Sequence, residues 1–279
     1  MAWSDQPENK PKPPTPQSLL RSIERHLHEQ SGATRDTAFE AQQLYYDAME
    51  AQTDEEEREL IEKALKLDPT NVDALLTQAG NCVCTDEEYI EVVRKIVAVG
   101  EKKLGPRKFK EGAGDFWGVL ETRPYMRARE ELAEALRAAG RWEEAVAEWE
   151  GMLELNPNDN QGVRFSLLMG YLALVRLEEA RGLFKEYQGD CEYNTVFAWG
   201  GVLERFLSGD LPGAEKALVI ARNQNRYTQG FIKGHSRLPK YLPDGYSPGS
   251  KEEAVCYAEM LGTAWSRHPS ALKWLGEQK

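Results

Sequence analysis

The stretch that decides the fold is GRWEEAVAEWEGMLELNP, residues 140–157. Gly140 suits a turn, and Pro157 ends a helix. Between them, the small Ala145 and the large Trp149 lie four positions apart and therefore on one helical face. The same pairing of a small with a large apolar residue recurs at spacings of 35 and 34 residues, first as Ala180 with Phe184 and then as Ala214 with Leu218.

A period of about 34 residues, with two helices and a turn in each repeat, is typical of the tetratricopeptide repeat. Two looser helix pairs precede the three repeats in register, at 36–50 with 54–67 and at 72–83 with 86–104. Strand signals are nearly absent. The sequence therefore predicts an all-α, tetratricopeptide-like, right-handed helical solenoid of about five helix pairs with a C-terminal capping segment.

The chain divides by composition into five predicted parts. A cap is expected because the last repeat of a solenoid has no neighbour to bury its apolar face. The parts are a disordered Pro-rich tail (1–17), N-terminal helices with two loose repeats (18–104), a loop (105–118), three tetratricopeptide repeats (119–226), and a cap with a turn-rich segment and two helices (227–279).

Charge and composition narrow the possible partners. The 279 residues include 35 Lys and Arg against 46 Asp and Glu, a net charge of −11, which disfavours nucleic acid as the main partner. The four cysteines form no disulfide framework and are expected to be reduced. Because we find neither the apolar core of a signal peptide nor a membrane-spanning run, we expect a soluble, cytoplasmic protein without a membrane partner.

Catalytic signatures are missing from the sequence. The four histidines are scattered, and we find no HExxH motif, Cys/His cluster or nucleophile elbow. We therefore expect no catalytic residues, cofactor or metal, and a protein that is not an enzyme. An unrecognised enzyme remains an alternative.

A charged stripe marks the first helix of the repeat around Ala145. Its members are spaced by four and three residues, so they share one helical face, and repeat positions of this kind line the concave groove. One interpretation is a groove wall that binds a charged peptide, and the other is a solvated face with pairs inside the helix. The stripe consists of Arg123, Arg127, Glu130, Glu134 and Arg137.

The equivalent positions of the next repeat are apolar: Phe165, Met169 and Leu172. Phe and Met offer adaptable surface to an amphipathic helix, so these residues extend the predicted peptide-binding groove. Contact with an adjacent helix or with the C-terminal segment is the alternative interpretation.

Arg129 and Arg164 occupy a repeat position that usually carries a large packing residue. A buried charge without a partner is costly, so we expect both arginines to be paired with carboxylates or helix-end carbonyls. An anion site between repeats is the alternative.

Residues 222–240 carry five basic side chains and no acidic one. Tyr227 and Phe231 lie among these bases, a mixture that can stack single-stranded nucleic acid. A capping segment whose bases complement the acidic body explains the same pattern. An RNA-associated regulator that uses this segment is therefore an alternative function.

Residues 35–275 resemble the suppressor of tumorigenicity seven family, a group of tetratricopeptide-like proteins. The segments that carry the resemblance are 74–105, Asn223 to Asn225, Leu238–Pro239 and 249–275. The chain lacks the membrane segments of the animal members. The resemblance implies an interaction or regulatory role and supplies no catalytic residues. The function predicted from all these features is a non-catalytic scaffold that binds a peptide or protein segment in the concave groove.

Overall fold

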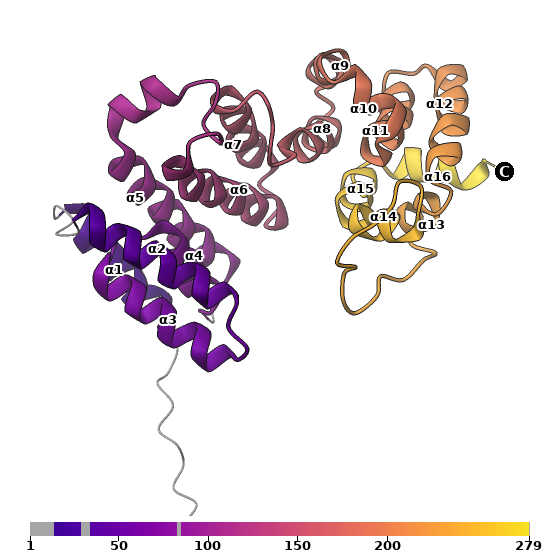
Figure 1. The fold of residues 1–279 in the computed structure, drawn as a ribbon. Helices are drawn as coiled ribbons and strands as arrows, with labels where there is room; N and C mark the ends of the chain where they lie inside the picture. Colours follow the sequence, from indigo (N-terminus) through magenta and orange to yellow (C-terminus); the bar gives the residue numbers. More distant parts are fainter. Residues whose placement is uncertain (1–13, 29–33, 83–84, 279) are drawn as a thin grey trace, which may run out of the picture. The chain divides into compact units, whose positions relative to one another are not determined.

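The computed structural model describes residues 14–28, 34–82 and 85–278, and every regular element in these ranges is helical (Figure 1). The chain forms two compact units, residues 1–139 (the N-terminal unit) and 140–279 (the C-terminal unit). The predicted all-α architecture is confirmed, and successive helices of the described residues pack as pairs. The predicted block 119–226, however, spans the boundary between the two units, so its first helix belongs to the N-terminal unit.

The N-terminal unit contains two successive helix pairs, α2 with α3 and α4 with α5, while α1 and α6 also pack against α5. The predicted pairs at 36–50 with 54–67 and at 72–83 with 86–104 correspond to these helices. The bounds are α1 Pro16–His28, α2 Arg35–Met49, α3 Asp54–Leu67, α4 Val72–Gly80, α5 Asp86–Gly112, the short 3-10 helix η1 Leu120–Thr122, and α6 Arg123–Ala138.

Side-chain caps fix where these helices begin. Thr34, Thr53 and Asn71 each accept a hydrogen bond from a backbone N–H of the first helical turn. Thr85 forms a complete capping box with Glu88. Such caps satisfy donors that have no partner inside the helix, which is why Ser, Thr, Asp and Asn favour these positions.

The loop predicted at 105–118 is shorter than expected. Helix α5 breaks at Gly105, whose φ of 68° suits glycine, and then continues from Pro106 to Gly112. Proline is well tolerated at the start of the second segment because its missing N–H is not needed there. The predicted disordered tail lies mostly outside the described residues, and α1 already begins at Pro16.

The C-terminal unit continues the pattern with the helix pairs α8 with α9 and α11 with α12. Glycine or valine with positive φ occupies the turn of the repeat, at Gly140 (77°), Val175 (59°) and Gly209 (83°). The bounds are α7 Trp142–Leu155, α8 Val163–Ala173, α9 Leu177–Glu186, α10 Gln188–Tyr193, α11 Thr195–Leu207, α12 Leu211–Gln224, α13 Thr228–Ile232, α14 Lys251–Cys256, α15 Ala258–Ser266 and α16 Pro269–Glu277.

The C-terminal segment caps the stack with more helices than the sequence indicates. Of the two helices predicted for the cap, the first is interrupted at Tyr257, so that α14 and α15 are separate. Helix α15 packs against α8 and α11 and buries Leu261 and Trp265 completely. The cap therefore lies against the first helices of the two repeats in this unit.

Among the described residues, no helix is both long and apolar enough to cross a bilayer. Cys82 and Cys256 are free thiols, while Cys84 and the side chain of Cys191 lie outside the described part.

Candidate functional site: a groove between α9, α11 and α12

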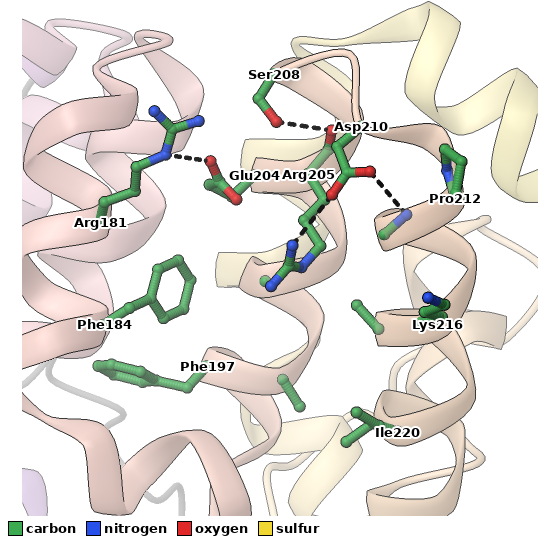
Figure 2. A pocket seen from close by; sticks show the side chains of 14 residues that line it. Arg181, Phe184, Phe197, Glu204, Arg205, Ser208, Asp210, Pro212, Lys216 and Ile220 are labelled. Atoms are coloured by element: carbon green, nitrogen blue, oxygen red, sulfur yellow. Dashed lines mark hydrogen bonds and ion pairs between the residues drawn. The ribbon is translucent and has the colours of Figure 1, made fainter.

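A groove of about 770 Å³ opens on the C-terminal unit. Figure 2 shows side chains of α9 on one side of it, α11 behind it and α12 on the other side. We refer to it as the α11 groove. Its lining consists of Arg181, Phe184, Phe197, Ala198, Gly201, Glu204, Arg205, Ser208, Asp210, Pro212, Gly213, Lys216, Ala217 and Ile220.

Small residues keep the floor of the α11 groove open. Ala198 and Gly201 come from α11, and Ala217 comes from α12. A Cβ atom placed on Gly201 would meet only the Cζ atom of Phe184, at 4.0 Å. That distance is an ordinary van der Waals contact, so the space above Gly201 is available to another side chain.

Aromatic and aliphatic side chains give the groove an apolar surface. Phe184 and Phe197 pack edge to face, with their ring centroids 5.7 Å apart. Phe197 is buried, and Phe184 is partly exposed on the α9 side. On α12, Ile220 is 59% exposed and its neighbour Val219 is 58% exposed. Large apolar side chains with this exposure are available for contact with a partner.

Three ion pairs among the described residues involve side chains of the rim. Arg181 Nε donates to Glu204 Oε1 over 2.8 Å, and Arg181 also pairs with Glu178. The hydrogen bond to Glu204 raises the pKa of the Arg181 guanidinium. At the other end, Arg205 pairs with Asp210, whose carboxylate also caps α12 by accepting from the backbone N–H of Gly213 (Figure 2). These pairs fix the positions of charged groups around the apolar floor.

Lys216 extends the positive charge of the rim. It is exposed, and within the part of the chain that the structure describes it has no hydrogen-bond or ion-pair partner. The described residues also contain no group of three His, Cys, Asp or Glu side chains placed to hold a metal ion. The arrangement of an apolar floor with charged edges is suited to recognition of a side chain or a short segment.

Arg127, a member of the predicted stripe, holds a buried carboxylate of its own unit. Its Nε and Nη2 atoms donate to the two oxygens of Asp73 over 2.8 and 2.6 Å. The Asp73 side chain is 1% exposed and also accepts from Gln42. Burial alone would lower the pKa of Arg127, but the hydrogen bonds and attraction of Asp73 raise it above its usual value.

The other members of the stripe are half-buried on α6. Arg123 Nε donates to the carbonyl of Trp117 over 2.8 Å, and its guanidinium lies over the Trp117 ring. Arg137 donates to Glu134, three residues before it, over 2.8 Å. Pairs of this spacing are common on helix surfaces. Glu130 also lies on this helix, and binding of a peptide by the stripe stays a prediction.

Arg164 has two carboxylate partners, Asp159 at 2.7 Å and Asp190 at 2.6 Å. Its guanidinium also lies 4.2 Å from the ring centre of Phe165. Asp159 is buried and accepts from the first backbone N–H groups of α8, so Arg164 links α8 to the loop before it and to α10. Arg129 lies over the ring of Tyr125 at 6.0 Å.

The predicted apolar patch on α8 lies beneath the cap. Met169 and Leu172 are buried, and Phe165 packs against Tyr257 with ring centroids 6.0 Å apart. The cap also hydrogen-bonds this helix, since His268 bonds the carbonyl of Leu172 and Arg267 donates to that of Ala173. Met169 and Leu172 also lie against Gly200 of α11, so both side chains are enclosed and are not open to a peptide in this conformation.

Within the basic segment 222–240, Arg222 is bonded within the fold, whereas Arg226 is exposed and, among the described residues, bonds only its neighbour. Arg222 donates to Gln229 and to the carbonyl of Gln278, and Arg226 donates to the hydroxyl of Tyr227. The remaining three, Lys233, Arg237 and Lys240, lie at or beyond the end of α13.

Sequence reasoning missed the α11 groove. It treated the first helices of the repeats as the binding face, whereas the groove is lined by the second helices α9 and α12 together with α11. One signal was present: the pair Gly200–Gly201 lies in the middle of a helix, where glycine is unfavourable and usually has a packing or functional reason.

Comparison with known proteins gives little further guidance. No family model and no curated protein matches the chain. Among solved structures, it is similar to YrrB, described as a TPR protein with an unusual peptide-binding site. The identity is 16%, the TM-score is 0.47, and the match covers 75% of this chain and 93% of that one. The resemblance to the suppressor of tumorigenicity seven family stays a prediction.

Proposed function

We propose that the chain is a non-catalytic scaffold that binds a short segment of a partner protein in the α11 groove. The observation that carries this proposal is the open apolar floor at Gly201, bordered by Phe184 and Ile220 and edged by fixed charges. Burial of one large apolar side chain contributes roughly 1.5–3 kcal/mol, so an apolar anchor on the floor supplies part of the free energy of binding.

The lining indicates what kind of segment fits. The floor favours aliphatic or aromatic side chains of the ligand, because Ala198, Gly201 and Ala217 leave room and offer no hydrogen bonds from their side chains. Lys216 favours an acidic residue of the ligand next to these apolar side chains, because its ammonium group has no partner among the described residues. An amphipathic segment with an apolar anchor and a nearby carboxylate meets both requirements.

The test fills the groove without disturbing the fold. The full chain is used to select binders from a displayed library of random peptides, and the affinity of the enriched peptides is then measured for Gly201→Leu. The added side chain occupies the space above the floor, so we expect at least a tenfold loss of affinity. Gly182→Leu is the matched control, since Gly182 lies on α9, does not line the groove and has nothing within 4 Å of an added Cβ.

If Gly201→Leu binds the selected peptides as well as the wild-type chain does, the α11 groove is not the site. Equal loss in Gly201→Leu and Gly182→Leu also counts against it, because the effect would then not depend on the groove. The cytoplasmic location and the lack of enzymatic activity remain expectations from the sequence.

A further inference from the structure

A long loop, residues 233–250, joins α13 to α14 in the C-terminal unit (Figure 1). It contains turns and bends but no helix. We refer to it as the cap loop. Its central run, Arg237 to Leu242, reads RLPKYL, and all six residues are exposed.

Large apolar side chains are concentrated in the cap loop. Tyr241 is 75% exposed and Leu242 is 65% exposed, while Leu238 and Tyr246 are 49% and 45% exposed. Four such residues within nine positions form a group, whereas single exposed apolar residues are ordinary on protein surfaces. None of these four lines the α11 groove, so the two surfaces are distinct.

Positive charge accompanies these apolar side chains. Arg237 and Lys240 belong to the central run, and Lys233 precedes it. The first acidic residue after Arg222 is Asp244. Lys240 lies over the ring of Tyr241 at 5.0 Å, and Arg237 has no partner among the residues that the structure describes. The loop therefore presents both cations and apolar groups to solvent.

We propose that the cap loop binds the surface of an anionic lipid bilayer. Leucine and tyrosine side chains can insert at the boundary between headgroups and acyl chains, while nearby lysine and arginine are attracted to acidic headgroups. Because both kinds of side chain occur in one exposed run, one short segment can make both contacts. This is a peripheral contact that needs no spanning helix.

Lipid fits the composition better than nucleic acid does. Leu238 and Leu242 can enter a bilayer, but aliphatic side chains cannot stack on bases as aromatic rings do. The net charge of the chain does not oppose the contact strongly, because residues 140–279 carry 16 Lys and Arg against 19 Asp and Glu, so most of the excess acid lies in residues 1–139. The sequence predicts no membrane partner because it has no spanning run, but contact with the bilayer surface does not require such a run.

The test measures co-sedimentation of the full chain with vesicles of phosphatidylcholine alone or of phosphatidylcholine mixed with phosphatidylserine. We expect binding to the mixed vesicles, much weaker binding to phosphatidylcholine alone, and weakening by salt. One base near an acidic membrane contributes about fivefold, so Arg237→Glu with Lys240→Glu should reduce binding by more than tenfold. Leu238→Ser with Leu242→Ser should also reduce it.

Matched controls carry the same chemical changes elsewhere. Lys185→Glu with Lys273→Glu repeats the charge reversal on exposed helix positions, and Phe39→Ser with Leu120→Ser removes apolar side chains that are 67% and 70% exposed. Circular dichroism checks that every variant is folded. The control variants should keep binding to the mixed vesicles.

Three results would overturn the proposal. The first is no binding of the folded wild-type chain to the mixed vesicles. The second is equal loss in the loop variants and the controls, which would mean that the contact lies elsewhere. The third is loop-dependent binding of single-stranded RNA without vesicle binding, which would assign the loop to nucleic acid instead.

Discussion

Gly100 and Gly201 both lie inside helices, one in each unit, and their surroundings differ. A Cβ atom on Gly100 would lie 3.1 Å from Cδ2 of the buried Tyr125 and 3.4 Å from Cγ2 of Val72. On Gly201 the nearest atom is 4.0 Å away and belongs to the partly exposed Phe184. The first glycine allows helices to pack closely, whereas the second leaves a groove open.

The same contrast holds for the charged side chains. Arg127 is used to neutralise Asp73, which is almost completely buried, and both oxygens of that carboxylate are taken. Around the α11 groove, Arg181 and Arg205 are about half exposed, and Lys216 has no hydrogen-bond or ion-pair partner among the described residues. Residues that stabilise the fold and residues available for a ligand are therefore distinguished by burial and not by residue type.

The largest expected effect comes from breaking the buried pair in the N-terminal unit. Arg127→Met leaves the Asp73 carboxylate buried with Gln42 as its one side-chain donor among the described residues, which should lower the free energy of unfolding by about 3–5 kcal/mol. Urea unfolding followed by circular dichroism measures this. Arg107→Met is the control, because the Arg107 side chain is 88% exposed.

Adding Asp73→Asn to Arg127→Met removes the buried charge and should recover part of the lost stability. If Arg127→Met is no less stable than Arg107→Met, the pair is not structural, and the interpretation of Arg127 as a groove residue gains support.

The next effect concerns packing at Gly100. Gly100→Leu forces a side chain against Tyr125 and Val72, and overpacking of this kind costs about 1–3 kcal/mol. Gly80→Leu is the control, since an added Cβ at Gly80 meets nothing within 4 Å. A thermal unfolding series separates the two variants. Equal stability would mean that the α5–α6 contact is looser than described.

A smaller effect follows from Asp68, which ends α3 and accepts hydrogen bonds from Thr70 and Lys103. Burial alone would raise its pKa, but Lys103 and Thr70 lower it below the ordinary value of 3.8. A lowered pKa in the folded state means that the stabilisation is present above pH 3.8 and is lost as the pH falls through the folded value.

Asp68→Asn tests this pH dependence by unfolding at a series of acidic pH values. Asparagine occupies the corresponding helix ends at Asn156 and Asn225 in the C-terminal unit, so the variant should fold. We expect the variant to lose less stability than the wild type between neutral pH and pH 3. An identical acid profile would contradict the role given to Asp68.

The smallest expected change is an increase in the free energy of unfolding. Gly201→Leu replaces a poor helix former where space is open, so the free energy of unfolding should rise by roughly 0.5–1 kcal/mol. Thermal unfolding of the variant beside Gly182→Leu measures it. A loss of more than about 1 kcal/mol would indicate that the space above Gly201 is closed in solution.

The sequence predicted most of the helices because local rules determine them. Periodic apolar residues and Pro157 after a helix end placed the helix pairs near their observed positions. It overestimated the loop after Gly105, since a single glycine breaks α5 and the helix then resumes.

The contacts that individual side chains make with distant parts of the chain could not be predicted in the same way. Arg127 meets a carboxylate 54 positions earlier in the chain, and Phe165 is covered by Tyr257 of the cap. Neither contact follows from helical periodicity, because each depends on how distant segments pack. The α11 groove was missed for the same reason.

The central claim is that ligands enter the α11 groove while Arg127 and the α8 patch serve the fold. Amide chemical shifts of the isotopically labelled full chain, recorded during titration with a selected peptide, test it most directly. The account predicts the largest shifts at Ala198, Gly201 and Ala217. Largest shifts at Arg123 to Arg137 on α6, or at Met169 and Leu172 with displacement of the cap, would contradict it.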